Sequence, residues 1–190
     1  MKSIGILGGS FDPAHFGHLA TTKFVYEKRD LEKVIFIPNH ISPLKQSSVP
    51  TPDEHRLKMI RLAIEPFPYF EVSDFEIIKN GISYTYDTLV EFRKKYNEIE
   101  LIIGFDNLCV FDRWHNPEKI LELAKLVVMK RATDSEQKPN RFFESAIFID
   151  TPTVEISATD IRNRIKNNLS IDSLVPQNVK EYISQNRLYK

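Results

Sequence analysis

The sequence predicts an α/β protein with a mostly parallel sheet, helices on both faces and one domain covering residues 1–190. Short apolar runs alternate with helical patterns along the whole chain, as in folds built from strand–helix–strand units. A length of 190 residues suits a single hydrophobic core. A Gly-Gly pair follows the first apolar run, at the sheet edge where right-handed crossovers gather the loops that bind ligands.

The first strand–helix–strand unit is expected over residues 3–38. Residues 3–7 form a short apolar strand, and residues 33–38 (KVIFIP) form a second one. Between them, residues 18–28 contain no glycine or proline, so the helix begins at about Gly17. A second helix follows, because the Thr-Pro-Asp-Glu stretch at residues 51–54 has the pattern of a capping box. It runs to about residue 64, before Pro66.

The remaining elements continue the alternation. Strands are expected at residues 70–75 (with 76–78 as an optional extension), 100–104, 126–129 and 146–149, and helices at 87–96, 116–124, 158–168 and 177–185. Residues 133–141 are polar and contain proline, which favours a mobile surface loop.

Composition excludes several classes of protein. The 26 basic and 26 acidic residues cancel, so no overall field attracts nucleic acid, and no apolar run approaches the roughly 20 residues of a membrane span. The single cysteine, Cys109, can form neither an internal disulfide nor a cysteine zinc site, and no targeting segment is apparent. We therefore expect a cytoplasmic protein with small-molecule partners; homo-oligomerisation is left open.

The loop after the first strand has the features of a phosphate site. Gly8 and Gly9 carry no Cβ, so the backbone can turn sharply and bring its N–H groups close to a ligand. The loop delivers His18 to a helix start, where the helix dipole favours an anion, and His15 lies three residues earlier. A Gly-Gly pair alone is also common in ordinary turns, so this feature needs support from elsewhere.

Other sites of similar appearance fit less well. The chain has no G-x-G-x-x-G element with an acidic group after the second strand, and no G-x-x-x-x-G-K-[ST] element. Metal binding by His15, His18 and His40 is disfavoured, because the sequence has a single carboxylate near them, Asp12, and no H-E-x-x-H pattern. We expect no metal held by the protein itself.

Two elements far apart in the chain resemble the signatures of the HxGH nucleotidyltransferases, whose fold is Rossmann-like. GGSFDPAHFGH at residues 8–18 is similar to G-x-F-D-P-x-H-x-G-H, and ISATDIR at residues 156–162 is similar to I-S-x-T-x-I-R. From the residues alone, Ser157 is expected to cap a surface helix, with Arg162 near its positive end. The resemblance implies an ATP site built from Gly8, Gly9, Ser10, Phe11, His15, His18, Asp106, Ser157, Thr159 and Arg162.

Within that superfamily the chain most resembles the nicotinate-nucleotide adenylyltransferases. SYTYDT at residues 83–88 and IGFDN at residues 103–107 followed by Trp114 match that family's elements. The resemblance implies that Thr85 holds the pyridine carboxylate, Asp106 a ribose hydroxyl and Trp114 the pyridine ring. The implied mononucleotide site comprises Gly9, Ser10, Lys45, Tyr84, Thr85, Trp114 and Arg131. Thr85 and Asp106 could instead be only helix caps, and Trp114 only a core residue.

The implied reaction transfers AMP from ATP to nicotinate mononucleotide and releases pyrophosphate. His15, His18, Lys45 and Arg162 are the expected catalytic residues, and Mg²⁺ is expected to enter mainly on the ATP phosphates. The alternatives are a sister phosphopantetheine adenylyltransferase or cytidylyltransferase, and a nucleotide-sensing module without catalysis. Leu44 stands before Lys45, where the family often has histidine.

Overall fold

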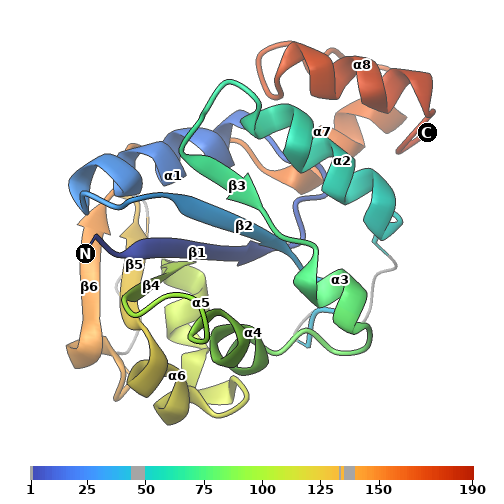
Figure 1. Ribbon diagram of the computed structural model, residues 1–190. Helices are drawn as coiled ribbons and strands as arrows, with labels where there is room; N and C mark the ends of the chain where they lie inside the picture. The colour runs from blue at the N-terminus through green and yellow to red at the C-terminus, as the bar shows by residue number, and fades with distance from the viewer. Residues whose placement is uncertain (1, 44–49, 133, 135–139) are drawn as a thin grey trace.

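A computed structural model describes residues 2–43, 50–132, 134 and 140–190. Within these residues six strands form one parallel sheet in the order β3-β2-β1-β4-β5-β6 (Figure 1). The strands are β1 (Ile4–Gly9), β2 (Val34–Pro38), β3 (Phe70–Val72), β4 (Ile99–Gly104), β5 (Lys125–Lys130) and β6 (Ala146–Asp150). The predicted α/β class with a Rossmann-like parallel sheet is confirmed.

Helices cover both faces of the sheet (Figure 1). One face carries α1 (Phe16–Lys28), α2 (Asp53–Ile64), α7 (Ala158–Lys166) and α8 (Gln177–Gln185). The other carries α4 (Thr85–Phe92), α5 (Phe105–Cys109) and α6 (Pro117–Leu123), with the short 3₁₀ turns η1 (Phe111–Arg113) and η2 (Phe143–Ser145). A short helix, α3 (Phe75–Lys79), lies between β3 and α4 in the chain.

The central strands contribute side chains to two hydrophobic cores, because successive side chains point to opposite faces of the sheet. In β2, Val34 and Phe36 join the core beneath α1 and α2, whereas Ile35 and Ile37 join the core beneath α4 and α6. The central strands are buried on both sides, which explains why they are continuous apolar runs in the sequence.

The chain reverses its direction of travel across the sheet between β1 and β4. From β1 it moves outward through β2 and β3, then returns to place β4 on the other side of β1. In open parallel sheets such a switch point leaves a crevice at the carboxyl ends of the two strands, and ligands bind there. The Gly8-Gly9 pair therefore lies at the position where this topology creates a binding site.

Two local predictions are wrong. Residues 75–79 form α3, not the end of a strand, and β3 stops at Val72. The Thr-Pro-Asp-Glu stretch does begin α2, but Pro52 occupies the cap position and no side chain caps the helix. The N–H of Thr51, which Glu54 would accept from in a capping box, instead donates to the carboxylate of Asp12 (3.2 Å), so the box does not form.

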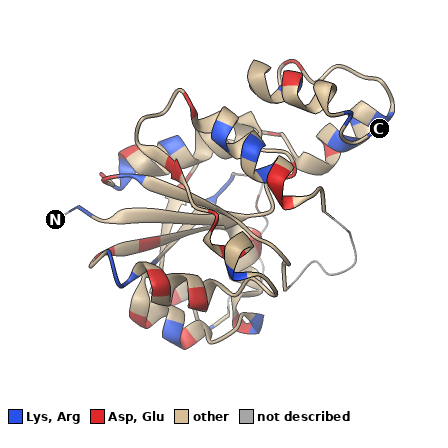
Figure 2. Cartoon of the chain, turned by 45° about the vertical axis from the view of Figure 1, so that its right-hand side comes forward, with Lys and Arg blue, Asp and Glu red and all other residues tan. Residues whose placement is uncertain are grey.

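Charged side chains of both signs are interspersed over the outer helices (Figure 2), in keeping with the zero net charge. In the part of the chain that the structure describes, no helix has the length and apolar character to cross a bilayer. The predicted loop at residues 133–141 lies mostly outside the described residues.

Candidate active site

Residues 8–18, here called the phosphate loop, lead from the end of β1 into α1, and the side chain of Phe11 packs against them. That side chain is 3% exposed, and its ring lies where a Cβ on Gly9 would approach to 3.0 Å. A side chain at position 9 would therefore crowd the Phe11 ring, which a glycine avoids. Because the Phe11 side chain belongs to the core, only the backbone of Phe11 can meet a ligand.

The two histidines of the loop form a stacked pair at the start of α1. Their ring centroids lie 3.6 Å apart, and the N–H of His18 donates to Nδ1 of His15, which caps the helix (3.4 Å). A Cβ on Gly17 would lie 3.0 Å from the His15 ring, so Gly17 leaves the room that the pair needs. The sequence predicts that both histidines face one anion. The structure brings their rings into contact at the helix start.

Burial fixes the chemical form of His15. The side chain is 5% exposed, and burial lowers its pKa from 6.5 to about 4, so the imidazole is neutral near pH 7. Since Nδ1 accepts the hydrogen bond from His18, the proton resides on Nε2. His15 is therefore a neutral donor through Nε2, able to bind a phosphate oxygen without carrying charge.

The second signature docks against the first. Ser157 caps α7 by accepting from the N–H of Asp160 (3.0 Å), as predicted from the sequence. From one turn further along, Arg162 donates to the backbone carbonyl of Asp12 (2.7 Å) and to the hydroxyl of Thr159 (3.2 Å). The helix start and its guanidinium thus lie beside the phosphate loop.

The carboxylate of Asp12 is buried and held by two donors. Its oxygens accept from the N–H of Thr51 (3.2 Å) and from the hydroxyl of Tyr189 (2.6 Å), near the C-terminus. Burial is the main cause that raises the pKa of Tyr189, and the charge on Asp12 adds to it, so the phenol stays a donor. These contacts make Asp12 a support of the loop.

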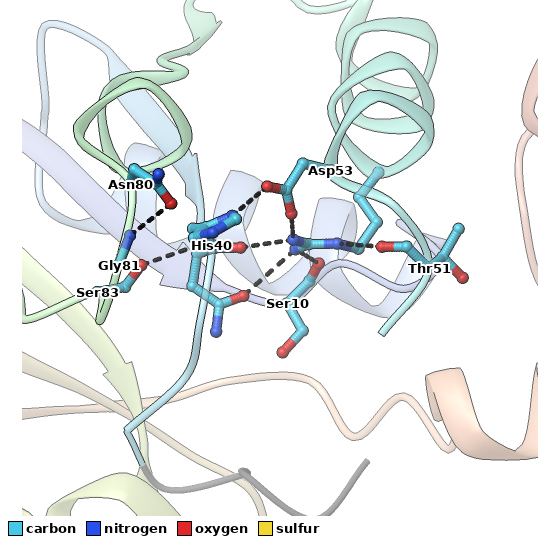
Figure 3. A network of polar contacts seen from close by, with 9 residues as sticks. Ser10, His40, Thr51, Asp53, Asn80, Gly81 and Ser83 are labelled. Atoms are coloured by element: carbon cyan, nitrogen blue, oxygen red, sulfur yellow. Dashed lines mark hydrogen bonds and ion pairs between the residues drawn. The ribbon is translucent and has the colours of Figure 1, made fainter. Parts of the chain in front are cut away.

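A fully buried arginine supports the loop from the opposite side. Arg56 of α2 is 0% exposed and donates to the carbonyls of Ser10 (2.8 Å), Asn39 (2.6 Å) and Thr51 (2.9 Å), and it pairs with the carboxylate of Asp53. Figure 3 shows Ser10, Thr51 and Asp53 arranged around this guanidinium. Every polar direction of the buried charge therefore meets an acceptor, the condition under which such a charge is tolerated.

The same network reaches a second loop. Asp53 also contacts Nδ1 of His40, and the N–H of His40 donates to the hydroxyl of Ser83 (2.8 Å; Figure 3). Ser83 opens the SYTYDT element. One chain of polar contacts thus joins the phosphate loop to the segment that the sequence assigns to the pyridine ring.

A cavity of about 530 Å³ opens at the switch point between β1 and β4. Its lining includes Gly8, Gly9 and Ser10 of the phosphate loop, and Tyr84, Thr85 and Trp114. Residues that the resemblance assigns to ATP and residues that it assigns to a pyridine mononucleotide therefore line one cavity of a volume typical for a small ligand.

Tyr84, Trp114 and His115 form an aromatic part of the cavity lining. Tyr84 lies against the ring of His115 (centroids 4.4 Å apart), and Trp114 packs on Phe111 at a tilt of 41°. Trp114 is half-buried, and its Nε1 has no hydrogen-bond partner among the described residues. Thr85 is the first residue of α4, and the cap position belongs to Tyr84, so the alternative of Thr85 as a cap is wrong.

The described lining of the cavity lacks several of the predicted site residues: Phe11, His15, His18, Asp106, Arg131, Ser157, Thr159 and Arg162. Asp106 is exposed in the first turn of α5, directly after β4, and Gly104 holds the cap position. Arg131 is exposed after β5 and is absent from the described lining of the cavity; its N–H donates to Asp134 (2.7 Å). Lys45 and Leu44 lie outside the described residues.

Sequence reasoning missed the buried supports of the site, above all Arg56 and Glu76. A signal for Arg56 exists, because it lies three, four and seven residues before Met59, Ile60 and Ala63 on the buried face of α2. An arginine at an apolar position of a helix indicates a buried charge with fixed partners. No comparable periodicity marks Glu76, since α3 has only five residues.

Comparison with known proteins agrees with this geometry. Residues 6–164 match the model of the cytidylyltransferase-like family. A Clostridium beijerinckii protein named "Probable nicotinate-nucleotide adenylyltransferase" is 41% identical over 204 aligned residues, covering all of both chains. A Bacillus cytotoxicus protein of the same name is 39% identical over 192 aligned residues, again covering both chains completely.

Solved structures share the fold. A Plasmodium falciparum nicotinic acid mononucleotide adenylyltransferase complexed with NaAD superposes with a TM-score of 0.79 at 20% identity, over 100% of this chain and 98% of that one. The same enzyme complexed with APC gives a TM-score of 0.76 at 19% identity, with the same coverage. With the second signature docked against the first and relatives similar over their full length, the chain belongs to the nicotinate-nucleotide adenylyltransferases of the cytidylyltransferase-like family.

Proposed function

We propose that this protein transfers the adenylyl group of ATP to nicotinate mononucleotide, giving nicotinate adenine dinucleotide and pyrophosphate. The observation that carries the proposal is the shared cavity, which is lined both by Gly8, Gly9 and Ser10 and by Tyr84, Thr85 and Trp114. A mononucleotide with its ring at Trp114 has its phosphate directed along the cavity toward the phosphate loop. That placement brings an attacking oxygen toward the α-phosphorus of ATP.

ATP is assigned to the phosphate loop and the α7 start. The backbone of Gly8, Gly9, Ser10 and Phe11 supplies N–H donors, and Nε2 of His15 supplies a neutral one. His18 stabilises the charge that develops on the transferred group. Arg162, with Ser157 and Thr159 at the helix start, and Lys45 stabilise the departing pyrophosphate.

The acceptor is assigned to the other end of the cavity. Trp114 stacks on the pyridine ring, and Thr85 binds the pyridine carboxylate through its N–H and hydroxyl. Tyr84 and Arg131 are assigned to the same mononucleotide, whereas Asp106 is assigned to a ribose hydroxyl of ATP. This arrangement distinguishes a pyridine mononucleotide from the phosphopantetheine of a sister enzyme, which has no ring to stack.

Positioning and charge stabilisation account for the chemistry. An oxygen of the acceptor phosphate attacks the α-phosphorus in line, a new P–O bond forms, and the bond to pyrophosphate breaks as its electrons pass to the leaving oxygen. A phosphate monoester is largely ionised near neutral pH, so no strong general base is required. Neutral His15 is consistent with a role as hydrogen-bond donor, and the reaction does not need it as a general base.

Magnesium fits this site as a companion of ATP. Among the described residues no group of three or more His, Cys, Asp or Glu side chains is placed to hold a metal ion, and both oxygens of Asp12 already accept hydrogen bonds. Mg²⁺ retains much of its water and binds nucleotide phosphates with few protein ligands. When bound, it neutralises phosphate charge, and the residues named above orient the nucleotide around it.

A substrate panel tests the proposal. Purified protein is supplied with ATP or CTP and with nicotinate mononucleotide, nicotinamide mononucleotide or phosphopantetheine, and pyrophosphate release is measured. The proposal expects the highest kcat/KM with ATP and nicotinate mononucleotide. Turnover with phosphopantetheine alone would establish the sister reaction, and release of no pyrophosphate in any mixture would establish a nucleotide-sensing module.

A further inference from the structure

Glu76 of α3 is the one acidic side chain among the described residues that line the cavity. It is 7% exposed, and it accepts a hydrogen bond from the hydroxyl of Thr88 (2.6 Å). Burial raises the pKa of Glu76, and hydrogen bonds from Thr88 and Ser83 oppose that rise. Three buried polar side chains therefore meet in the wall of the cavity: Glu76 of α3, Thr88 of α4 and Ser83 of the segment between these helices.

Glu76 is not explained as half of an ion pair. The nearest cation, Lys79, donates to Asp87 (2.6 Å), and Glu76 belongs to no salt bridge within the described residues. A buried carboxyl without a cationic partner costs stability, because desolvation is met only by hydroxyl donors. Such a group in a ligand cavity indicates a functional constraint.

The partners of Glu76 bracket the proposed pyridine site. Ser83 precedes Tyr84 and Thr85, and Thr88 lies one turn of α4 after Thr85. Ser83 is also tied to the loop after β2: its N–H donates to the carbonyl of Ile41 (2.9 Å), and its hydroxyl accepts from the N–H of His40 (Figure 3). Glu76 thus holds both ends of the turn that presents Tyr84 and Thr85.

We propose that Glu76 is a positioning residue for the acceptor mononucleotide, fixing residues 83–88 so that Tyr84 and Thr85 receive the pyridine ring. This assignment rests on the proposed function. Glu76 acts through Ser83 and Thr88 and takes no part in bond making. Its removal therefore weakens acceptor binding and leaves the ATP end of the cavity intact.

E76Q is the sharpest test, because it keeps the size of the side chain. The amide replaces one acceptor oxygen by a donor and removes the charge, so the hydroxyls of Ser83 and Thr88 lose a charged acceptor and one of its two oxygens. We expect the KM for nicotinate mononucleotide to rise roughly tenfold, the effect of losing one hydrogen bond to a charged group, and the KM for ATP to change by less than about twofold. E91Q, on the exposed Glu91–Lys94 pair of α4, is the matched control and keeps both values.

Trp114 gives an independent readout, since it is the only tryptophan in the chain and lines the cavity. Titration of its fluorescence with nicotinate mononucleotide, without ATP, should show the same rise in half-saturating concentration for E76Q. T88V should act in the same direction, and the E76Q/T88V double variant should lose less than the sum of the two single effects. If Glu76 had only a structural role, E76Q would lower the midpoint of thermal unfolding but would leave the acceptor KM and the fluorescence titration unchanged.

The outcomes separate the two proposals. Wild-type protein that does not turn over nicotinate mononucleotide contradicts the proposed function itself. Wild-type protein that does so, with E76Q matching it in acceptor KM and in fluorescence titration, overturns the assignment of Glu76 alone.

Discussion

Arg162 donates a hydrogen bond to the backbone carbonyl of Asp12 across 2.7 Å, although 150 positions separate them in the chain. The contact fastens the start of α7 to the phosphate loop. Under the proposed function both elements supply donors to the ATP phosphates, and this contact holds the two elements side by side.

Arg162→Ala is expected to raise the KM for ATP or lower kcat by at least about tenfold, because it removes a charge-assisted donor beside the phosphates. The binding of nicotinate mononucleotide, followed by Trp114 fluorescence, should change much less. Arg164→Ala on the same helix removes a donor to Ser170 and serves as the control. Equal losses for both ligands would contradict a role at the phosphate end.

His18→Ala should lower kcat by roughly 10² to 10³, the scale of one lost preorganised donor. Steady-state pyrophosphate release measures the effect. His55→Gln, which changes a histidine paired with the hydroxyl of Tyr182 between α2 and α8, should leave kcat near wild type. A His18 variant with wild-type turnover would remove this residue from the catalytic set.

His15 makes stability depend on pH in a defined direction. Its pKa is about 4 in the fold and 6.5 when unperturbed, so between these values the unfolded chain binds more protons. The contribution of neutral His15 to the free energy of unfolding is fully present above pH 6.5 and is lost as the pH falls toward 4. Between pH 7 and pH 5 the free energy of unfolding should fall by about 2 kcal/mol from this group.

His15→Asn checks that sign, because asparagine retains a helix-capping oxygen but does not titrate. Urea unfolding of wild type and variant at pH 7 and pH 5 gives the two pH dependences. The variant should lose about 2 kcal/mol less than wild type across this interval. Identical pH dependences would show that His15 is not held neutral.

Arg56→Met should lower the free energy of unfolding by about 3–5 kcal/mol, because it leaves the half-buried carboxylate of Asp53 and several carbonyl oxygens without their donor. Arg61→Met, on the exposed pair with Asp74, should cost less than about 1 kcal/mol. Urea denaturation of both variants supplies the comparison. An equal and small effect for the two would contradict the role of Arg56 as a buried support.

The sequence allowed the strands, most helices and the two signatures to be predicted, because these depend on local rules. Apolar runs identify β1, β2 and β4, and the cap at Ser157 follows from a side chain three residues before its donor. The His15–His18 pair was likewise predictable from spacing at a helix start. Each of these features involves residues that are close in the chain.

What could not be predicted depends on partners distant in the chain. Residues 76–78 have an apolar character that suits a strand, yet they form α3, where Glu76 meets Thr88 of α4. The capping-box pattern at residues 51–54 failed because Pro52 takes the cap position and the N–H of Thr51 donates to the distant Asp12. Tertiary contacts override local propensity at these positions, and they are the positions that support the site.

The central claim is that the phosphate of nicotinate mononucleotide attacks the α-phosphorus of ATP within the shared cavity. Nicotinate mononucleotide carrying heavy oxygen on its phosphate tests this most directly, with mass spectrometry of both products. The account predicts that every heavy oxygen of the acceptor phosphate is retained in nicotinate adenine dinucleotide and that pyrophosphate carries none. Loss of a heavy oxygen from the dinucleotide, or its appearance in pyrophosphate, would contradict it.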